Sequence, residues 1–189
     1  IIIMKYIVFD TEFTSWEGSQ ENNWSKKGEH RELVQIGAYK IHNGEIIETL
    51  NLFIKPRINP LLSKYFIDLT GITNKKINKD GLNFFLAMEQ FYKFTNDVNY
   101  IYSYGNDYGI IEENMILNNV PINSKFFKKS WKSKFFDFKI LLDDKINTNN
   151  YTSGTIYKAF DIKMDDNHKI HNALDDSYSL YLVSKKIIK

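Results

Sequence analysis

Hydrophobic residues in the first third of the chain follow patterns that are typical of β-strands. Residues 6–9 form a short apolar run rich in β-forming side chains, which predicts a strand buried on both faces. Residues 32–41 and 45–54 predict two more strands, and Asn43-Gly44 between them is a strong signal for a hairpin. The sheet is therefore expected to begin with antiparallel pairs.

Helical patterns follow and alternate with extended ones. Residues 61–69 predict a short helix capped by Gly71, and residues 72–79 read as a connector rich in Lys and Asn. The next helix is predicted from an apolar stripe at Leu82, Phe85, Leu86, Phe91 and Phe94. Further elements are predicted as a strand at 98–102, helices at 108–118, 152–160 and 173–188, and a short apolar element of either type at 138–142.

This order of elements predicts an α/β fold with a mixed five-stranded sheet flanked by helices on both faces. The chain has 189 residues, of which 43% are hydrophobic, so it can bury one well-formed core. No internal repeat or low-complexity linker interrupts it. We therefore expect a single domain over residues 1–189.

Composition excludes several classes of site. The absence of Cys excludes a disulfide scaffold, a thiolate metal site and a Cys nucleophile, and it is compatible with a reducing, cytoplasmic location. The apolar run at residues 1–3 is too short to span a membrane, so no membrane partner is expected. A net charge of +2 does not by itself indicate nucleic-acid binding. The basic and aromatic residues of 124–136 either follow a nucleic-acid backbone or form a solvated loop over a small core.

Two acids follow the first predicted strand directly. Because side chains alternate along a strand, Asp10 and Glu12 point the same way, with Cα atoms about 7 Å apart. Two carboxylates about 5 Å apart repel each other by roughly 3 kcal/mol at an effective dielectric constant of about 20. The pair therefore needs a cation or a proton, unless the strand has ended and both acids lie in solvent.

A third acid lies in the apolar seam of the last predicted helix. The spacing of Ala173, Leu180 and Val183 places Asp176 on the same face, where a buried charge must be paired or coordinated. His171 lies five residues earlier, where its ring can reach the same pocket. Asp107, after the fourth predicted strand, is the fourth candidate, although Asp is also a common helix N-cap.

Residues 15–31 form a long polar segment that contains Trp16 and Trp24. Loops of this length without secondary structure often serve as lids or binding loops. The two Trp side chains either stack on a ligand or hold the loop against the domain.

These residues together resemble the DEDDh branch of the DnaQ-like 3′-to-5′ exonucleases, with the Eri-type and KapD-like members closest in pattern. The resemblance rests on Phe9-Asp10-Thr11-Glu12-Phe13-Thr14, the Asp107 segment, Leu69-Thr70-Gly71-Ile72-Thr73, and His171-Asn172-Ala173-Leu174-Asp175-Asp176. One motif departs from the pattern, because Gly105-Asn106-Asp107 is one residue shorter than the usual G-x-x-D.

The resemblance implies a ribonuclease H-like fold and a metal-dependent exonuclease that releases nucleoside 5′-monophosphates from single-stranded 3′ ends of DNA or RNA. It implies two Mg²⁺ ions, for which Mn²⁺ can substitute, with Asp10, Glu12 and Asp176 as ligands and Asp107 acting through water. His171 is implied as the general base. The terminal bases are expected to be held by Phe13, Thr14, Leu69, Thr70, Gly71 and Ile72.

Other readings stay open. The chain could be a nucleic-acid-binding module of the same fold without turnover, or a proofreading subunit held by a polymerase, and it could form a homodimer. Discrimination between DNA and RNA depends on contacts to the 2′-OH, which the sequence does not specify.

Overall fold

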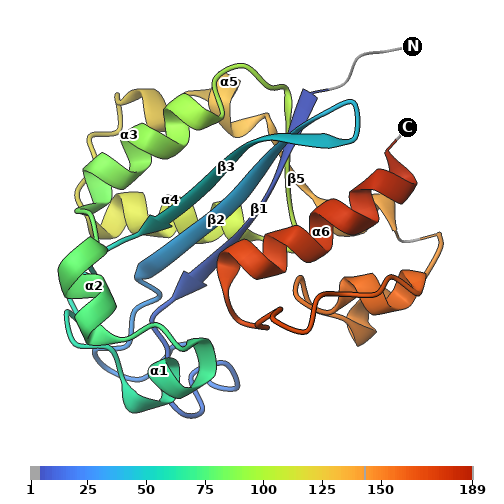
Figure 1. Cartoon of the computed structure of the whole chain (residues 1–189). Coiled ribbons are helices and arrows are strands. Elements are labelled where there is room, and N and C mark those ends of the chain that lie inside the picture. Colours follow the sequence, from blue (N-terminus) through green and yellow to red (C-terminus); the bar gives the residue numbers. More distant parts are fainter. Residues whose placement is uncertain (1–4, 143, 189) are drawn as a thin grey trace.

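The computed structural model describes residues 5–142 and 144–188 (Figure 1). Its sheet has the spatial order β3-β2-β1-β4-β5. The strands are β1 (Lys5–Phe13), β2 (Leu33–His42), β3 (Glu45–Phe53), β4 (Tyr100–Ser103) and β5 (Phe135–Asp137). β1 and β3 pair with β2 in antiparallel fashion, whereas β4 is parallel to both β1 and β5. The predicted mixed five-stranded sheet is confirmed.

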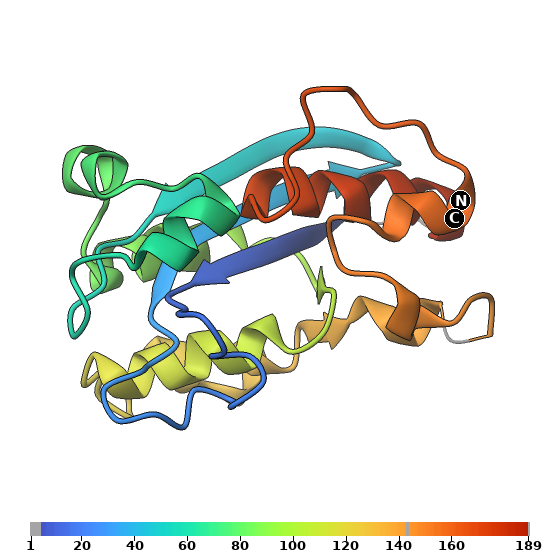
Figure 2. The same cartoon turned by 90° about the horizontal axis from the view of Figure 1, so that it is seen from below.

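Helices cover both faces of this sheet. The α-helices are α1 (Lys64–Thr70), α2 (Asn74–Asp80), α3 (Phe84–Phe94), α4 (Asp107–Leu117), α5 (Lys129–Lys132) and α6 (Ala173–Ile187). The 3₁₀ turns are η1 (Lys125–Phe127), η2 (Phe138–Leu141), η3 (Thr148–Asn150) and η4 (Ile156–Phe160). Viewed from below, α6 and α4 lie on opposite sides of β1 (Figure 2). None of the helices described is both long and apolar enough to cross a membrane.

Successive side chains of β1 point to opposite faces of the sheet and are buried in two separate hydrophobic cores. Ile7 and Phe9 are fully buried in the core that α3 and α4 cover. Tyr6 and Val8 are buried in the core beneath α6. Asp10 and Glu12 follow Tyr6 and Val8 at the same two-residue spacing, so their side chains must lie on the α6 face of the sheet.

β1 is longer than predicted, and its two neighbours end at different points. The sequence predicted a strand over 6–9, but β1 continues to Phe13 because β2 pairs with it along this whole length. On the other side, pairing with β4 stops at Val8. The last residues of β1 therefore have an open side, at the point where a sheet with diverging neighbours forms a crevice.

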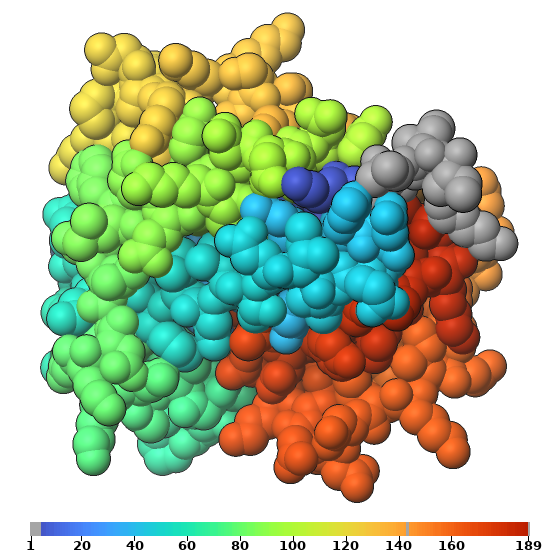
Figure 3. All heavy atoms as spheres, turned by 45° about the horizontal axis from the view of Figure 1, so that its top comes forward, coloured from blue at the N-terminus to red at the C-terminus, as the bar shows by residue number. Residues whose placement is uncertain are grey.

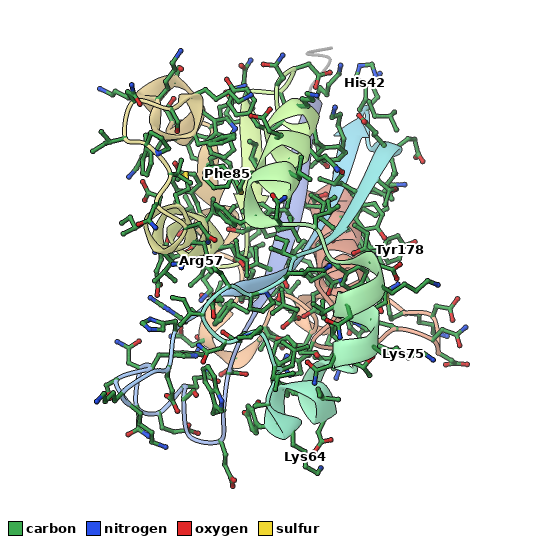
Figure 4. All side chains as sticks on the ribbon, turned by 90° about the vertical axis from the view of Figure 1, so that its left-hand side faces the viewer. His42, Arg57, Lys64, Lys75, Phe85 and Tyr178 are labelled. Atoms are coloured by element: carbon green, nitrogen blue, oxygen red, sulfur yellow. The ribbon has the colours of Figure 1, made fainter. Side chains whose placement is uncertain are left out.

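Two helical predictions need correction. Residues 72–79, predicted as a connector, contain helix α2, which the Thr73 side chain caps and which buries Ile77. The predicted apolar stripe of α3 is confirmed at Phe91 and Phe94 but wrong at Phe85 and Leu86, which are 45% and 52% exposed. Phe85 is labelled on this helix in Figure 4. The buried face is formed by Phe84, Ala87, Met88, Phe91 and Phe94.

The segments after α4 also differ from prediction. β5 lies partly within the basic stretch 124–136, and the predicted helix at 152–160 is only the short turn η4. The basic stretch supports the solvated-loop reading, because Phe126 and Trp131 are buried in the core. Lys125 and Lys132 form ion pairs with acids of neighbouring helices. At the opposite edge of the sheet, β3 lies open on the surface between α3 and α6 (Figure 3).

Candidate active site

The five predicted catalytic residues meet at one pocket of about 490 Å³ beside the carboxyl end of β1. The pocket is lined by Asp10, Glu12, Asp107, His171 and Asp176, among others, and we call it the site pocket. Asp10, Glu12 and Asp176 are only 6%, 9% and 3% exposed. Acids that are far apart in the sequence are thus buried together, so the reading that the strand-end acids lie in solvent is wrong.

Asp107 reaches the pocket from the opposite face of β1. Thr11 points away from Asp10 and Glu12, toward the start of α4, and its Oγ1 and N both donate to Asp107 Oδ1, at 2.6 and 3.1 Å. The N-cap of α4 is Asn106, whose side chain accepts from Gly109 N. The Asp107 carboxylate is therefore not used as the helix cap, and the shortened G-x-D spacing still brings it to the pocket.

His171 and Asp176 are joined locally at the start of α6. The backbone of His171 is left-handed, with φ of 66°, a conformation that non-glycine residues adopt at a cost. Its N–H donates to Asp176 Oδ2 at 3.3 Å. One ligand atom from each of Glu12, His171 and Asp176 lies within 4.8 Å of the others. The turn before α6 thus brings the ring to the carboxylates, as the H-x₄-D spacing predicts.

Asp176 is enclosed by the loop before η4. A Cβ atom added at Gly154 would lie 2.2 Å from Asp176 Oδ1, so a larger residue there would force the loop or the carboxylate to move. Ser153 Oγ lies 3.5 Å from the other oxygen, Asp176 Oδ2. His168, which the sequence left as a surface residue, has its Nε2 3.0 Å from the Gly154 carbonyl oxygen. The contacts of Ser153 with Asp176 and of His168 with Gly154 hold this loop beside the carboxylate.

The N-terminus of α6 rests on two residues of β2. Gln35 is fully buried, and its Oε1 accepts from Ala173 N while its Nε2 donates to Asn172 Oδ1. A Cβ at Gly37 would lie 2.2 Å from Leu174 N, so the helix backbone approaches the strand closely here. These contacts fix the helix that carries Asp176 against the strand that lies beside Asp10 and Glu12.

Burial raises the pKa of every carboxyl group in the cluster, and repulsion between the acids adds to it at Asp10, Glu12 and Asp176. Desolvation, followed by the charges of the other acids, raises the pKa values of Asp10 and Glu12 well above their usual range. Burial also raises the pKa of Asp107 to about 6, against the opposing hydrogen bonds from Thr11. It raises the pKa of Asp176 to about 7. The cluster therefore retains protons unless positive charge is brought to it.

The pKa of His171 shifts downward, opposite to the pKa values of the acids. Partial burial lowers the pKa of its imidazole, because desolvation disfavours the charged form. The ring is then neutral at neutral pH, the state in which it can accept a proton.

The donor set fits divalent metal. Among the described residues, Asp176 Oδ1 is one of three buried side-chain polar atoms that have no hydrogen-bond partner. A buried polar atom without a partner is costly, and a cation would satisfy it. Carboxylate oxygens are the ligands that Mg²⁺ and Mn²⁺ prefer. Asp10, Glu12 and Asp176 supply such oxygens in one place.

Three aromatic side chains and one leucine form a wall of the site pocket on the side of α1, which we call the aromatic wall. Phe13, Trp24, Tyr65 and Leu69 line it. Trp24 holds its loop against the domain, because its Nε1 donates to Thr14 O and its ring contacts Phe13 at a centroid distance of 5.5 Å. Its place in the lining keeps stacking on a ligand as a prediction. Trp16 is not among the lining residues.

Four predicted base-contacting residues lie outside the lining of the pocket. Thr14 is buried, with its hydroxyl donating to His30 O and accepting from Glu32 N. Thr70 and Ile72 are buried beside α1, and Gly71 is its left-handed C-cap. Of the six candidates, Phe13 and Leu69 therefore face the pocket directly.

Several lining residues were missed by sequence reasoning. They are Tyr65, Tyr104, Lys139, Tyr151 and Ser153. Tyr104 could have been found, because it directly follows β4 at the sheet edge that holds the acids. Tyr65 lies on α1, and Lys139, Tyr151 and Ser153 lie on turns and loops whose placement depends on tertiary packing rather than on any local pattern.

The sequence is similar to those of known exonucleases. The family model described as exonuclease (RNase_T) matches residues 7–183. The probable 3′-5′ exonuclease KapD of Bacillus subtilis is 25% identical over 188 residues, covering 96% of this chain and 83% of KapD. The PolC-type DNA polymerase III of Caldanaerobacter subterraneus is 26% identical over 154 residues, which make up 72% of this chain but 10% of the polymerase.

Solved structures share the fold. The nuclease domain of 3′hExo, a DEDDh family member bound to rAMP, superposes with a TM-score of 0.78 at 16% identity, covering 99% of this chain and 92% of that domain. Escherichia coli ExoI in complex with single-stranded DNA gives a TM-score of 0.68 at 16% identity, covering 96% of this chain and 40% of ExoI.

Proposed function

The chain belongs to the DEDDh, DnaQ-like family of 3′-to-5′ exonucleases, and from this premise we propose that it hydrolyses phosphodiester bonds at single-stranded 3′ ends and releases nucleoside 5′-monophosphates. The observation that carries the proposal is the burial of Asp10, Glu12 and Asp176 in one pocket, with an Asp176 oxygen that has no partner. A cluster of this kind is stable in its charged form only with cations, and an exonuclease of this family uses such cations for catalysis.

We propose that Asp10, Glu12 and Asp176 hold two Mg²⁺ ions, or Mn²⁺ in their place. Bound there, the ions would polarise the phosphate and lower the pKa of a water molecule. Asp10 and Glu12 are held in place by the β1–β2 ladder, and Asp176 is held by Gly154 and the His171 N–H. Asp107, fixed by Thr11, would act from the other face through water.

The proposed general base is His171. Its lowered pKa keeps the imidazole neutral near pH 7, so it can take the proton from the attacking water. The left-handed turn at this residue holds the ring beside Glu12 and Asp176. Rigid placement of a base next to its target avoids the cost of ordering it during the reaction.

The aromatic wall supplies a place for the terminal bases. Stacking on aromatic side chains contributes about 1 to 3 kcal/mol per base and tolerates any sequence. We propose that Phe13, Trp24 and Tyr65 stack on the bases and that Leu69 packs against them. Little base preference is expected.

One specific observation supports a second candidate role, as a proofreading activity associated with a polymerase. The PolC-type polymerase of Streptococcus mutans is 37% identical over 92 residues, 49% of this chain and 5% of the polymerase. Copurification of this chain with a replicative polymerase would support that role, whereas an active nuclease that binds no polymerase would exclude it.

A labelled oligonucleotide tests the proposed activity. A single strand of DNA and a matched strand of RNA, each labelled at the 5′ end, should be shortened stepwise from the 3′ end in Mg²⁺, and EDTA should abolish the shortening. The product should run as a nucleoside 5′-monophosphate on thin-layer chromatography. Binding of both strands without any shortening would contradict the proposal and favour a nucleic-acid-binding module.

A further inference from the structure

Lys139, on turn η2, places a positive charge in a pocket dominated by acids. Among the described lining residues of the site pocket, the other cation of the Lys and Arg type is Arg31, whose guanidinium pairs with Glu113 at 2.7 Å. None of the ion pairs between described residues involves Lys139. Its Nζ instead lies 4.8 Å from the centre of the Tyr104 ring, which also lines the pocket.

Hydrogen bonds fix both the backbone of Lys139 and the Tyr104 ring that lies against its ammonium group. Asp137 Oδ1 accepts from Lys139 N at 2.9 Å and from Gly105 N at 3.0 Å, so the turn after β5 is tied to the turn after β4. The Tyr104 hydroxyl donates to Thr148 O at 2.6 Å, which sets the plane of the ring beneath the ammonium. An aromatic face attracts a cation without neutralising it. The ammonium is thus positioned while its charge stays available to a ligand.

Lys139 and the aromatic wall lie on different sides of the pocket. α1 and the turns η2 and η3 lie on different sides of β1 (Figure 2). A strand whose bases stack on the α1 side presents its sugar-phosphate backbone away from that wall. The four carboxylates would repel this backbone, and ions held by Asp10, Glu12 and Asp176 would serve only the phosphate that reacts.

We propose that Lys139, seated on Tyr104, binds a phosphate of the single strand other than the one that is cleaved, and so fixes the strand along the site pocket. This inference rests on the proposed function and deepens it. Lysine binds phosphate as a point charge, and such a contact positions a nucleic acid without reading its sequence. Lys139 would therefore contribute to substrate binding for any base sequence.

Oligonucleotides with one uncharged linkage test this contact. Each internal phosphodiester near the 3′ end is replaced in turn by a methylphosphonate, and kcat/KM is measured for the wild type, Lys139→Met and Lys145→Met. Lys145, an exposed lysine between η2 and η3, serves as the control. For the wild type, we expect one linkage whose neutralisation lowers kcat/KM about tenfold, as for loss of a hydrogen bond to a charged group.

Lys139→Met should already be about tenfold weaker on the unmodified strand, mainly through KM, and should lose nothing more at that linkage. Lys139→Arg should recover part of the loss, and Lys145→Met should behave like the wild type. Equal sensitivity of Lys139→Met and the wild type at every linkage would overturn the inference. Fluorescence anisotropy of the same strands repeats the comparison without turnover, so an inactive protein would contradict the proposed function without deciding the role of Lys139.

Discussion

Asp176→Asn is expected to abolish exonuclease activity while leaving the fold intact. Loss of partners that only support metal ligands already costs about 10- to 100-fold in metal affinity or activity, so loss of a ligand should cost more than about 100-fold. An Asn side chain keeps an oxygen for the His171 N–H, and it removes one charge from a crowded cluster. The metal-free variant should therefore unfold at the same temperature as the wild type or at a higher one. The measurements are the rate of nucleotide release and the melting temperature in EDTA.

The neighbouring acid provides a matched control for this variant. Asp175 is one residue earlier, does not line the site pocket, and accepts from Lys169 N. Asp175→Asn should keep nearly all of the activity. If Asp176→Asn retained activity within a few fold, or if both variants lost it equally, the assignment of Asp176 as a metal ligand would be wrong.

Gly154→Ala is expected to have the second largest effect, although the change is one methyl group on a loop. The added Cβ would lie 2.2 Å from Asp176 Oδ1 and 2.7 Å from its Cγ, distances that force the loop or the carboxylate to move. A displacement of about 1 Å at a reacting centre can lower the rate by about 100-fold. The rate should fall by roughly this factor, and a higher Mg²⁺ or Mn²⁺ concentration should be needed for half-maximal activity.

A second crowded glycine separates this effect from general destabilisation. A Cβ at Gly81 would lie 2.5 Å from the Ile77 carbonyl oxygen, outside the lining of the site pocket. Gly81→Ala should lower the melting temperature but leave the metal requirement unchanged. A Gly154→Ala enzyme with the wild-type rate and metal requirement would show that the loop does not position Asp176.

The acids of the site were predictable from the sequence because each lies in a pattern that has a separate physical cause. Strand alternation gave Asp10 and Glu12 a common direction, and helical spacing put Asp176 in a buried seam. The family motif then joined them to His171 and Asp107, and the family and the mixed sheet are confirmed. Each of these inferences needs only local periodicity or residue order.

The parts that were missed depend on contacts between distant segments. Gly154 is required because a carboxylate 22 residues later packs against it, and Gln35 is buried because α6 begins above β2. The first turn of the α3 stripe was misplaced because Phe84, Phe85 and Leu86 are consecutive, and periodicity alone does not choose among adjacent apolar residues. Short turns such as η2, which carries Lys139, have no period to detect.

The central claim is that buried carboxylates are gathered to bind divalent ions. Their raised pKa values mean that the folded protein keeps protons which the unfolded chain has already released. Stability of the metal-free protein should therefore fall as the pH rises from about 4, the ordinary carboxyl value, to about 7, the pKa of Asp176. Above that pH Asp176 is charged and repels the neighbouring acids, so bound divalent ions should stabilise the fold most there.

Thermal unfolding across this pH range, with EDTA or with Mn²⁺, tests the claim most directly. In EDTA the melting temperature should fall between about pH 4 and about pH 7, and Mn²⁺ should raise it most at the upper end. Asp176→Asn should show a smaller fall and a smaller Mn²⁺ effect. A wild-type melting temperature that Mn²⁺ leaves unchanged above pH 7 would contradict the account.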